Sequence, residues 1–489
     1  MTNDTIWNVW QDGIQNLLIT SLSNSGELKV RQAESITGLL QSKGLLNYAS
    51  ITPSMAGTIS QKLDANVFVC GSINQAGSAL RMNAQLTDSK TGEIFKTFKI
   101  EDSAKEENIF RIIDSLSLML RDYLVISILE KELPKGLDQF VSTNSPEAFR
   151  YYINGINAFY KRDYPASRKW LFQAITIDSN FFAPTYFISS SYGNQGMFME
   201  AKKWGKKIYD KKDQLPMMEQ LMANQIYAAY FETPYEVIKY LKQMIEMEDQ
   251  NPRFYYNLGN TYNILLQYDK AIPALKKSLE IYRKWDTKPR WVYNYTVLGY
   301  AYHKTGKYKI EKKLYRQAEN DFPDDPALIS SEAVLAFAEG DTVGAVKYIE
   351  RFKSVLEESS ASKAEIASLL GDLYEEAGVL DEAEKYIRQA ATLDPVLQPV
   401  NVDTPGRLSW FLIYTGRNIN EGMKLIDEYL KLYPVNSWYL ATKGWGLYKQ
   451  GKYKEGLELL EKAMELRPIY THLLYLKIQE VKTAIANQK

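Results

Sequence analysis

After residue 140 the same short pattern of residues returns along the chain at a nearly constant spacing. Its four clearest copies are centred on Gly259, Gly299, Gly371 and Gly444. The spacing is 34 residues from Gly299 to Ala333 and 40 from Gly259 to Gly299, where residues 283–289 intervene. A period of this length indicates stacked helix pairs, because each pair can bury its apolar face only against its neighbours.

The residue types at the repeated positions have physical reasons to be there. A small residue in the middle of the first helix lets the second helix approach closely, and an alanine in the second helix does the same from the other side. A glycine after the first helix supplies a left-handed residue for the turn, and a proline after the second helix ends the unit. With weaker copies in register, we expect nine repeats over residues 146–469 and a capping helix over residues 470–489.

This pattern resembles the tetratricopeptide repeat, and the resemblance covers most of the chain after residue 146. It implies an all-α superhelical solenoid whose first helices line a concave surface that holds peptides or partner helices. We therefore expect a non-enzymatic binding scaffold or adaptor with a protein or peptide partner. The family's clamp for a terminal carboxylate uses basic residues at two positions where this chain has none, so chaperone tails are not the expected ligand.

The register of the repeat predicts which side chains face the concave surface. When the central glycine is counted as the eighth position, positions two, five, nine and twelve point away from the partner helix. Aromatic and amide side chains prevail there, and such side chains make good peptide contacts. The candidate binding residues are Tyr152, Ile156, Phe159, Arg253, Tyr256, Asn260, Asn263, Tyr293, Tyr300, His303, Asp372, Glu375, Trp438, Trp445 and Tyr448. The alternative is that several of them pack against neighbouring repeats.

Before residue 129 the pattern changes to short apolar strands between helices. Helices are expected over residues 7–23, 54–63 and 106–124, and strands over residues 28–31, 67–73, 79–87 and 93–100. The continuous apolar run over residues 67–73 indicates a buried strand, with Cys70 as a small core residue. Together these elements predict an α+β domain over residues 1–128, joined to the array by a linker over residues 129–145.

The order of these elements resembles the TolB amino-terminal-like domain, which accompanies tetratricopeptide arrays in bacterial regulators. The matching blocks are Asp12-Gly13-Ile14, residues 28–30, 65–73 and 81–88, and Thr91-Gly92-Glu93, so that about residues 9–125 are covered. Relatives open with an apolar strand that has no counterpart before Asp12, so we expect that an upstream piece is missing or that a partner supplies the strand. The alternative function is therefore the sensory or regulatory half of a larger signalling protein, whose kinase, nucleotide cyclase or winged-helix output domain lies outside this chain.

Composition argues against several other classes of protein. Because 59 basic side chains balance 59 acidic ones, no nucleic-acid partner is expected. One cysteine and two histidines offer no basis for a disulfide framework or a metal site, and no phosphate-binding or nucleophile motif occurs, so we expect no enzyme, no cofactor and no metal. The chain has no apolar stretch long enough to span a membrane. The single cysteine fits a cytoplasmic location, while a periplasmic location and a homo-oligomer formed through the amino-terminal domain stay open.

Overall fold

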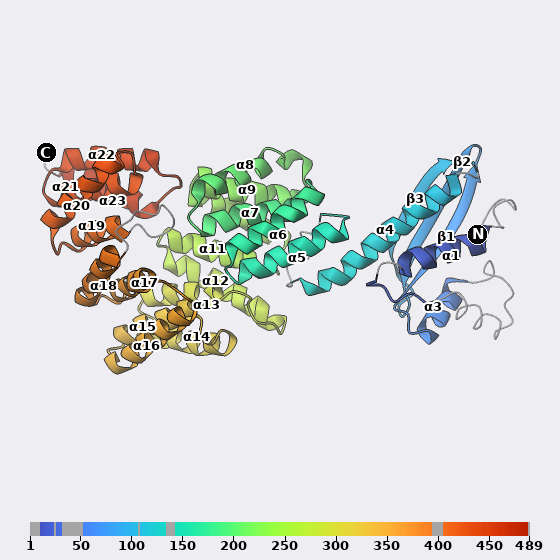
Figure 1. Cartoon of the computed structure of the whole chain (residues 1–489), viewed down its shortest axis with the longest axis horizontal. Helices are drawn as coiled ribbons and strands as arrows, with labels where there is room; N and C mark the ends of the chain where they lie inside the picture. The colour runs from blue at the N-terminus through green and yellow to red at the C-terminus, as the bar shows by residue number, and fades with distance from the viewer. Residues whose placement is uncertain are drawn as a thin grey trace. The chain divides into compact units, whose positions relative to one another are not determined.

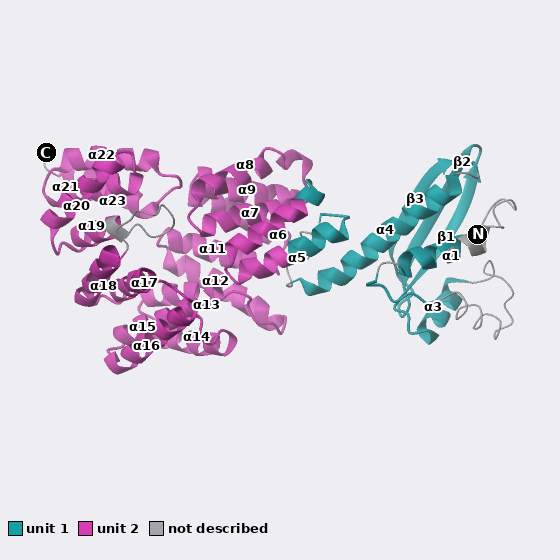
Figure 2. Ribbon diagram, viewed as in Figure 1, with its two compact units in different colours: residues 1–134, 141–153, 176–180 teal, residues 135–140, 154–175, 181–489 magenta. Residues whose placement is uncertain are grey.

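The computed structural model describes residues 10–23, 26–31, 52–105, 108–133, 142–393 and 404–487. It divides into two compact units (Figure 2). Unit 1 consists of residues 1–134, 141–153 and 176–180, and unit 2 consists of residues 135–140, 154–175 and 181–489. Unit 1 carries all the strands of the described residues, and unit 2 carries most of the helical array, coloured from green to red in Figure 1.

The sheet of unit 1 is an antiparallel meander of three strands in the order β1-β2-β3. Its elements are α1 (Trp10–Ser23), α3 (Pro53–Lys62), β1 (Val67–Ala76), β2 (Ala79–Asp88), β3 (Ile94–Ser103), α4 (Ile109–Leu129) and the short 3-10 helix η4 (Glu130–Glu132). Alternate residues of β2, including Leu80 and Leu86, are buried in one core with Ile112 and Ile113 of α4. The period of two in the sequence of β2 therefore predicts the buried face correctly.

Two details of unit 1 differ from the sequence-based expectation. Residues 28–31 form no strand, and Leu28 and Val30 pack against the core from an irregular segment instead. The strand β1 is not buried, since Val69 is 36% exposed and Cys70 is half-buried. The reason is that β1 lies at the edge of the sheet, where its only strand neighbour among the described residues is β2. Residues 7–9 and 106–107 of the expected helices lie outside the described residues.

After unit 1, the described residues form nine consecutive helix pairs and one last helix. The first helices of the pairs are α5 (Pro146–Tyr160), α7 (Phe182–Asn194), α9 (Met217–Phe231), α11 (Pro252–Ile264), α13 (Tyr293–Lys304), α15 (Pro326–Ala338), α17 (Lys363–Glu376), α19 (Thr404–Thr415) and α21 (Ser437–Lys449). The second helices are α6 (Tyr164–Ile177), α8 (Phe198–Tyr209), α10 (Pro234–Met247), α12 (Tyr268–Lys284), α14 (Tyr308–Asp321), α16 (Thr342–Glu358), α18 (Leu380–Leu393), α20 (Ile419–Leu432) and α22 (Tyr453–Leu466). A short 3-10 helix, η6 (Lys212–Gln214), precedes α9, and α23 (His472–Ala486) ends the array.

The small residues of the repeat allow the close helix contact for which the sequence argues. A methyl group on Gly259 would overlap the side chain of Leu275, and one on Gly299 would overlap Tyr315. The turn glycine Gly306 has a φ of 68°, in the left-handed region that residues with a side chain rarely adopt. The close helix contacts and the left-handed turn thus explain why small residues and glycines recur with this period in the sequence.

Among the described residues, no helix is long and apolar enough to cross a membrane. In the same part of the chain, no group of three or more His, Cys, Asp or Glu side chains is arranged to hold a metal ion.

Candidate partner-binding surface

Six of the fifteen candidate residues have buried side chains in this structure. They are Tyr152, Ile156, Phe159, Tyr256, Asn263 and Trp445. Asn263 shows the physical reason, because its Nδ2 donates a hydrogen bond to the carbonyl oxygen of Val297 on α13 at 3.0 Å. A side chain that points away from its own partner helix can thus point at the first helix of the next pair. In this structure these six residues pack against other residues of the chain.

The other nine candidates reach the surface to different degrees. Tyr300, Asp372 and Trp438 are exposed. The half-buried candidates are Arg253, Asn260, Tyr293, His303, Glu375 and Tyr448. Four of the nine, namely Tyr293, Tyr300, His303 and Asp372, line one hollow in unit 2.

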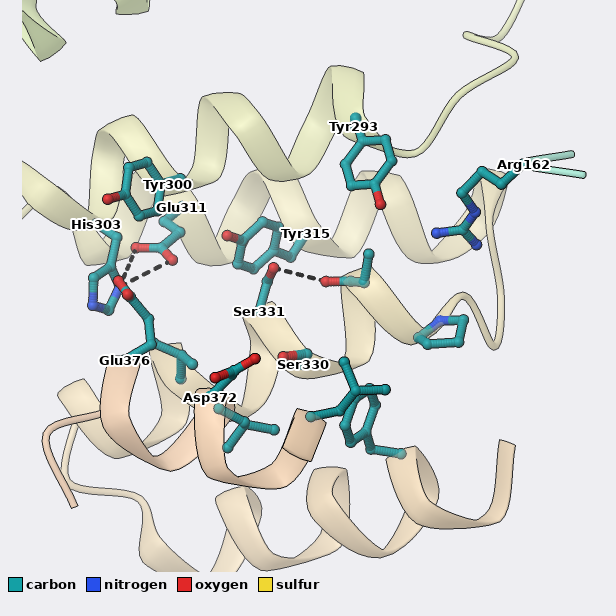
Figure 3. Close-up of a pocket in the computed structure, with 16 residues that line it drawn as sticks. Arg162, Tyr293, Tyr300, His303, Glu311, Tyr315, Ser330, Ser331, Asp372 and Glu376 are labelled. Carbon is teal, nitrogen blue, oxygen red and sulfur yellow. Dashed lines mark hydrogen bonds and ion pairs between the residues drawn. The ribbon is translucent and has the colours of Figure 1, made fainter. Parts of the chain in front are cut away.

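This hollow has a volume of about 480 Å³ and lies between α13, α14, α15 and α17 (Figure 3). Its volume is within the range of sites that hold a side chain or a short peptide segment. The lining residues that the sequence analysis did not single out are Arg162, Glu311, Tyr315, Pro326, Ala327, Ser330, Ser331, Val334, Phe352, Leu369, Leu373 and Glu376. Figure 3 shows Arg162 beside Tyr293 at one end, and His303 with Glu311 and Glu376 at the other.

A buried carboxylate lies at the His303 end of the hollow. The Nδ1 atom of His303 is 3.2 Å from each carboxylate oxygen of Glu311, and the Glu311 side chain is only 1% exposed. Burial raises the pKa of the Glu311 carboxyl, while the hydrogen bond from His303 opposes that shift. Burial also raises the pKa of the Tyr315 phenol well above its ordinary value, so this phenol stays protonated. This end of the hollow is therefore lined by buried polar side chains.

Charged side chains at the edge of the hollow lie over its aromatic rings. The Arg162 guanidinium is 2.8 Å from a carboxylate oxygen of Asp325 and 5.7 Å from the ring centroid of Tyr293. Lys304 lies 5.1 Å from the ring centroid of Tyr300 and forms an ion pair with Glu376. Both distances are in the range of cation–π attraction. Arg162 thus lines the hollow and Lys304 lies at its edge, whereas the sequence predicts a surface lined by aromatic and amide side chains rather than basic ones.

The carboxylates on α17 are paired with a basic residue of the next repeat. Arg407 of α19 contacts Asp372, with 3.0 Å between Nη2 and Oδ1, and also contacts Glu375. The Asp372 side chain is nevertheless 55% exposed, so its carboxylate still faces solvent. The two acidic candidates of α17 thus lie together, and the ion pair holds the Asp372 carboxylate at the rim of the hollow.

Three of the remaining candidates, Arg253, Trp438 and Tyr448, contact other side chains of the chain. Arg253 lies 4.5 Å from the ring centroid of Phe187 and 4.9 Å from that of Tyr186. The ring of Trp438 carries the guanidinium of Arg467 at 3.4 Å. The Tyr448 hydroxyl donates to a carboxylate oxygen of Glu480 on α23 at 3.0 Å, and burial together with this bond raises the pKa of the phenol.

The repeat register could not identify the basic residues of the hollow. Arg162 lies in the turn between α5 and α6, where its φ of 66° places it in the left-handed region. Asp325, its ion-pair partner, is 163 residues away in the sequence. No periodic signal connects two such positions, so only the coiling of the array brings them together.

Two segments of the array match family models. Residues 252–323 and residues 364–396 each match a model of the tetratricopeptide repeat. The chain contains tetratricopeptide repeats. The first match contains α11 to α14, and the second contains α17 and α18, so the hollow is built largely from tetratricopeptide helices.

Solved structures of other tetratricopeptide-like arrays are similar to this chain at low sequence identity. A chain of the APC/C hetero-tetramer Cut9-Hcn1 matches with 14% identity and a TM-score of 0.42, over 77% of this chain and 64% of that one. This chain thus spans less than two thirds of that relative. Yeast Tom70 matches with 16% identity and a TM-score of 0.35, over 79% of this chain and 75% of that one. No curated protein sequence matches this chain.

Proposed function

We propose that this protein is a non-enzymatic binding scaffold that holds a segment of a protein partner in the hollow between α13, α15 and α17. Tetratricopeptide arrays are typically protein-interaction modules, which supports a binding role. The observation that carries the proposal is the hollow of about 480 Å³ itself, whose lining includes the exposed ring of Tyr300, the half-buried ring of Tyr293 and the exposed carboxylates of Asp372 and Glu376.

The charge of the lining favours a basic segment of the partner. Glu311, Asp372 and Glu376 contribute three carboxylates to the lining, and Arg162 contributes one guanidinium. Lys304 and Arg407 pair with Glu376 and Asp372 from the edge of the hollow, yet both of these carboxylates stay exposed to solvent. A Lys or Arg side chain of the partner would share these two carboxylates and place its stem beside the Tyr293 and Tyr300 rings. An acidic segment would be repelled by the same exposed carboxylates.

A synthetic peptide array tests this proposal. Peptides that vary Lys, Arg, Asp and Glu at each position are probed with the wild-type chain, with the double variant Tyr300→Ala and Glu376→Gln, and with Tyr235→Ala. Tyr235 is 53% exposed on α10 and does not line the hollow, so it serves as the matched control. We expect Lys- or Arg-containing peptides to bind, and the double variant to weaken binding about tenfold or more while the control does not. Equal binding by all three proteins, or a preference for acidic peptides, would refute the proposal.

The amino-terminal unit supports a second proposal, in which the scaffold is the sensory half of a larger signalling protein. The resemblance of residues 9–125 to the TolB amino-terminal-like domain carries it, with the order α1, α3, β1, β2, β3 and α4 beside it. The exposed edge of β1 is the surface through which this unit would add a strand or a second copy. The gene upstream of Met1 tests this proposal: an adjoining kinase, cyclase or winged-helix domain would support it, and an in-frame stop before a native start would end it.

A further inference from the structure

The connection between α12 and α13 is the starting point for a further inference. Eight residues, 285–292, separate these helices, whereas four residues, 322–325, separate α14 from α15. This longer connection accounts for the wider spacing between Gly259 and Gly299 in the sequence. Its last residues are Arg290, Trp291 and Val292. Arg290 and Trp291 contact side chains from the end of α5, about 130 residues earlier in the sequence.

Arg290 is held by the carboxy-terminal end of α5. Its Nη2 donates a hydrogen bond to Oδ1 of Asn157 at 2.9 Å, and its guanidinium lies 5.5 Å from the ring centroid of Tyr160. Arg290 itself is exposed. An amide oxygen and an aromatic face are thus presented side by side to one guanidinium, which is a recognition arrangement that any arginine in an extended segment could use.

Trp291 fills an aromatic site next to that arginine. Its ring centroid is 4.9 Å from that of Tyr293, 5.8 Å from Tyr256, 6.1 Å from Phe159 and 6.5 Å from Tyr160. The site therefore takes rings from α5, α11 and α13. Phe159, Tyr256 and Tyr293 are three of the residues that the repeat register predicts for partner contact.

The indole nitrogen of Trp291 shows that the fit is incomplete. Among the described residues, no acceptor lies within hydrogen-bond distance of this buried N–H group. A buried donor without an acceptor weakens the interaction that holds it. The site thus accepts the shape of an aromatic ring but does not satisfy the polar group of a tryptophan.

We infer that Asn157, Phe159, Tyr160, Tyr256 and Tyr293 form a binding site for an extended protein segment in which a basic residue precedes an aromatic one. In the free protein, Arg290 and Trp291 occupy this site and compete with such a segment. The chain's own dipeptide is the argument for this ligand chemistry, since it shows which side chains the site accepts. Because Tyr293 also lines the hollow between α13, α15 and α17, a bound segment would continue from one site into the other. This inference rests on the proposed function in that both place the partner on the concave surface.

The test uses the full chain and a fluorescein-labelled peptide with the sequence of residues 285–293. Its binding to the wild type is compared with binding to the double variant R290A/W291A and to W285A. Trp285 is the matched control, because it contacts Tyr282 at 6.2 Å between ring centroids and is not part of the site. We expect the double variant to bind the peptide at least about tenfold more tightly than the wild type, since a tethered occupant acts at an effective concentration in the millimolar range. W285A should bind like the wild type.

The inference is overturned if a folded double variant shows no binding at about 1 mM peptide, or if wild type and double variant bind equally. Adding Y256A to the double variant should abolish the gain in peptide affinity, and persistence of that gain would also overturn the inference.

If the double variant does not fold, the single change R290A serves instead, because this side chain is exposed. It should raise amide hydrogen exchange at residues 290–293 about tenfold and leave residues 279–284 unchanged, and unchanged exchange at both would count against the site. The variant Tyr300→Ala should not affect the peptide in the double-variant background, so this inference and the proposed function can fail separately.

Discussion

Lys304 and Lys477 both contact aromatic rings of the array, but they differ in their exposure to solvent. Lys304 of α13 lies over Tyr300 in the central hollow and forms an ion pair with Glu376. All three side chains remain partly exposed there. Lys477 of α23 is only 8% exposed and lies 3.5 Å from the ring centroid of Trp445.

Three aromatic rings lie around the ammonium group of Lys477. Besides Trp445, Tyr414 lies at 4.5 Å and Trp410 at 4.9 Å, and both of these residues belong to α19. Among the described residues, no carboxylate is within ion-pair distance of Lys477. Burial lowers the pKa of Lys477 to about 7, with the charge of Lys449 acting in the same direction and that of Glu480 against it. The same combination of a cation and aromatic rings is thus partly exposed at Lys304 and largely buried at Lys477.

The comparison shows that the helix on which each lysine lies determines how far the lysine is exposed to solvent. Lys304 lies on a helix of the groove itself, and its carboxylate partner keeps it near solvent. Lys477 comes from the last helix, whose apolar residues Leu474, Ile478 and Val481 are buried against the final pair. The packing of that helix carries the ammonium of Lys477 into the aromatic site, so this cation is largely buried.

The largest loss of stability should come from a substitution in the aromatic site around Lys477. Trp445→Ala removes a side chain that is 4% exposed, and we expect the free energy of local unfolding of α21 to α23 to fall by about 3–5 kcal/mol. Trp438→Ala, at a ring that is 54% exposed, should cost about 1 kcal/mol. Native-state hydrogen exchange of these helices measures both changes. Equal losses of local stability in the two variants would show that the buried Trp445 ring stabilises these helices no more than the exposed Trp438 ring does.

An intermediate effect should appear in the pH dependence of stability. The pKa of Lys477 is lower in the folded than in the unfolded state, so between about pH 7 and pH 9 the unfolded state binds more protons and stability rises with pH. The contribution is at most about 1.4 kcal/mol per pH unit, and it is absent below pH 7, where both states are protonated. Hydrogen exchange of α23 at several pH values, corrected for the intrinsic exchange rate, should show this slope in the wild type and not in Lys477→Met. The same slope in both proteins would assign it to another group.

The smallest effect concerns the stability of the open hollow. Lys304→Ala removes an ion pair between side chains that are 31% and 40% exposed, so we expect a loss below about 1 kcal/mol in urea unfolding. Lys312→Ala is the matched control, because Lys312 forms a similar pair with Glu339 at 2.6 Å outside the lining of the hollow. The two losses should agree. A much larger loss for Lys304→Ala would mean that the ion pair supports the fold rather than only covering Tyr300.

More of the fold than of the candidate site could be predicted from the sequence. Gly259 and Gly299 mark close helix contacts, and Gly77 and Gly92, both with positive φ, mark the turns between the strands. These are local signals, and their structural consequences lie within one helix pair or one hairpin. The expected strand over residues 28–31 was wrong because strand formation depends on pairing with a distant segment, which no local pattern can guarantee.

The candidate site could be predicted only in part. The register brought Tyr293, Tyr300, His303 and Asp372 to one hollow, although it selected them without knowledge of their neighbours. It also selected Phe159, Tyr256 and Trp445, which are buried. These rings are covered by the chain's own Trp291 and Lys477, from a connection and a terminal helix that lie outside the repeated positions.

The sequence by itself determined the helix pairs and their period. Those properties depend on the spacing of small and large residues within about 34 positions, and the sequence shows that spacing directly. Only the tertiary structure decided which of the aromatic rings are open. That outcome depends on residues such as Arg162 and Asp325, which are brought into contact by the coiling of several repeats and are far apart in the sequence.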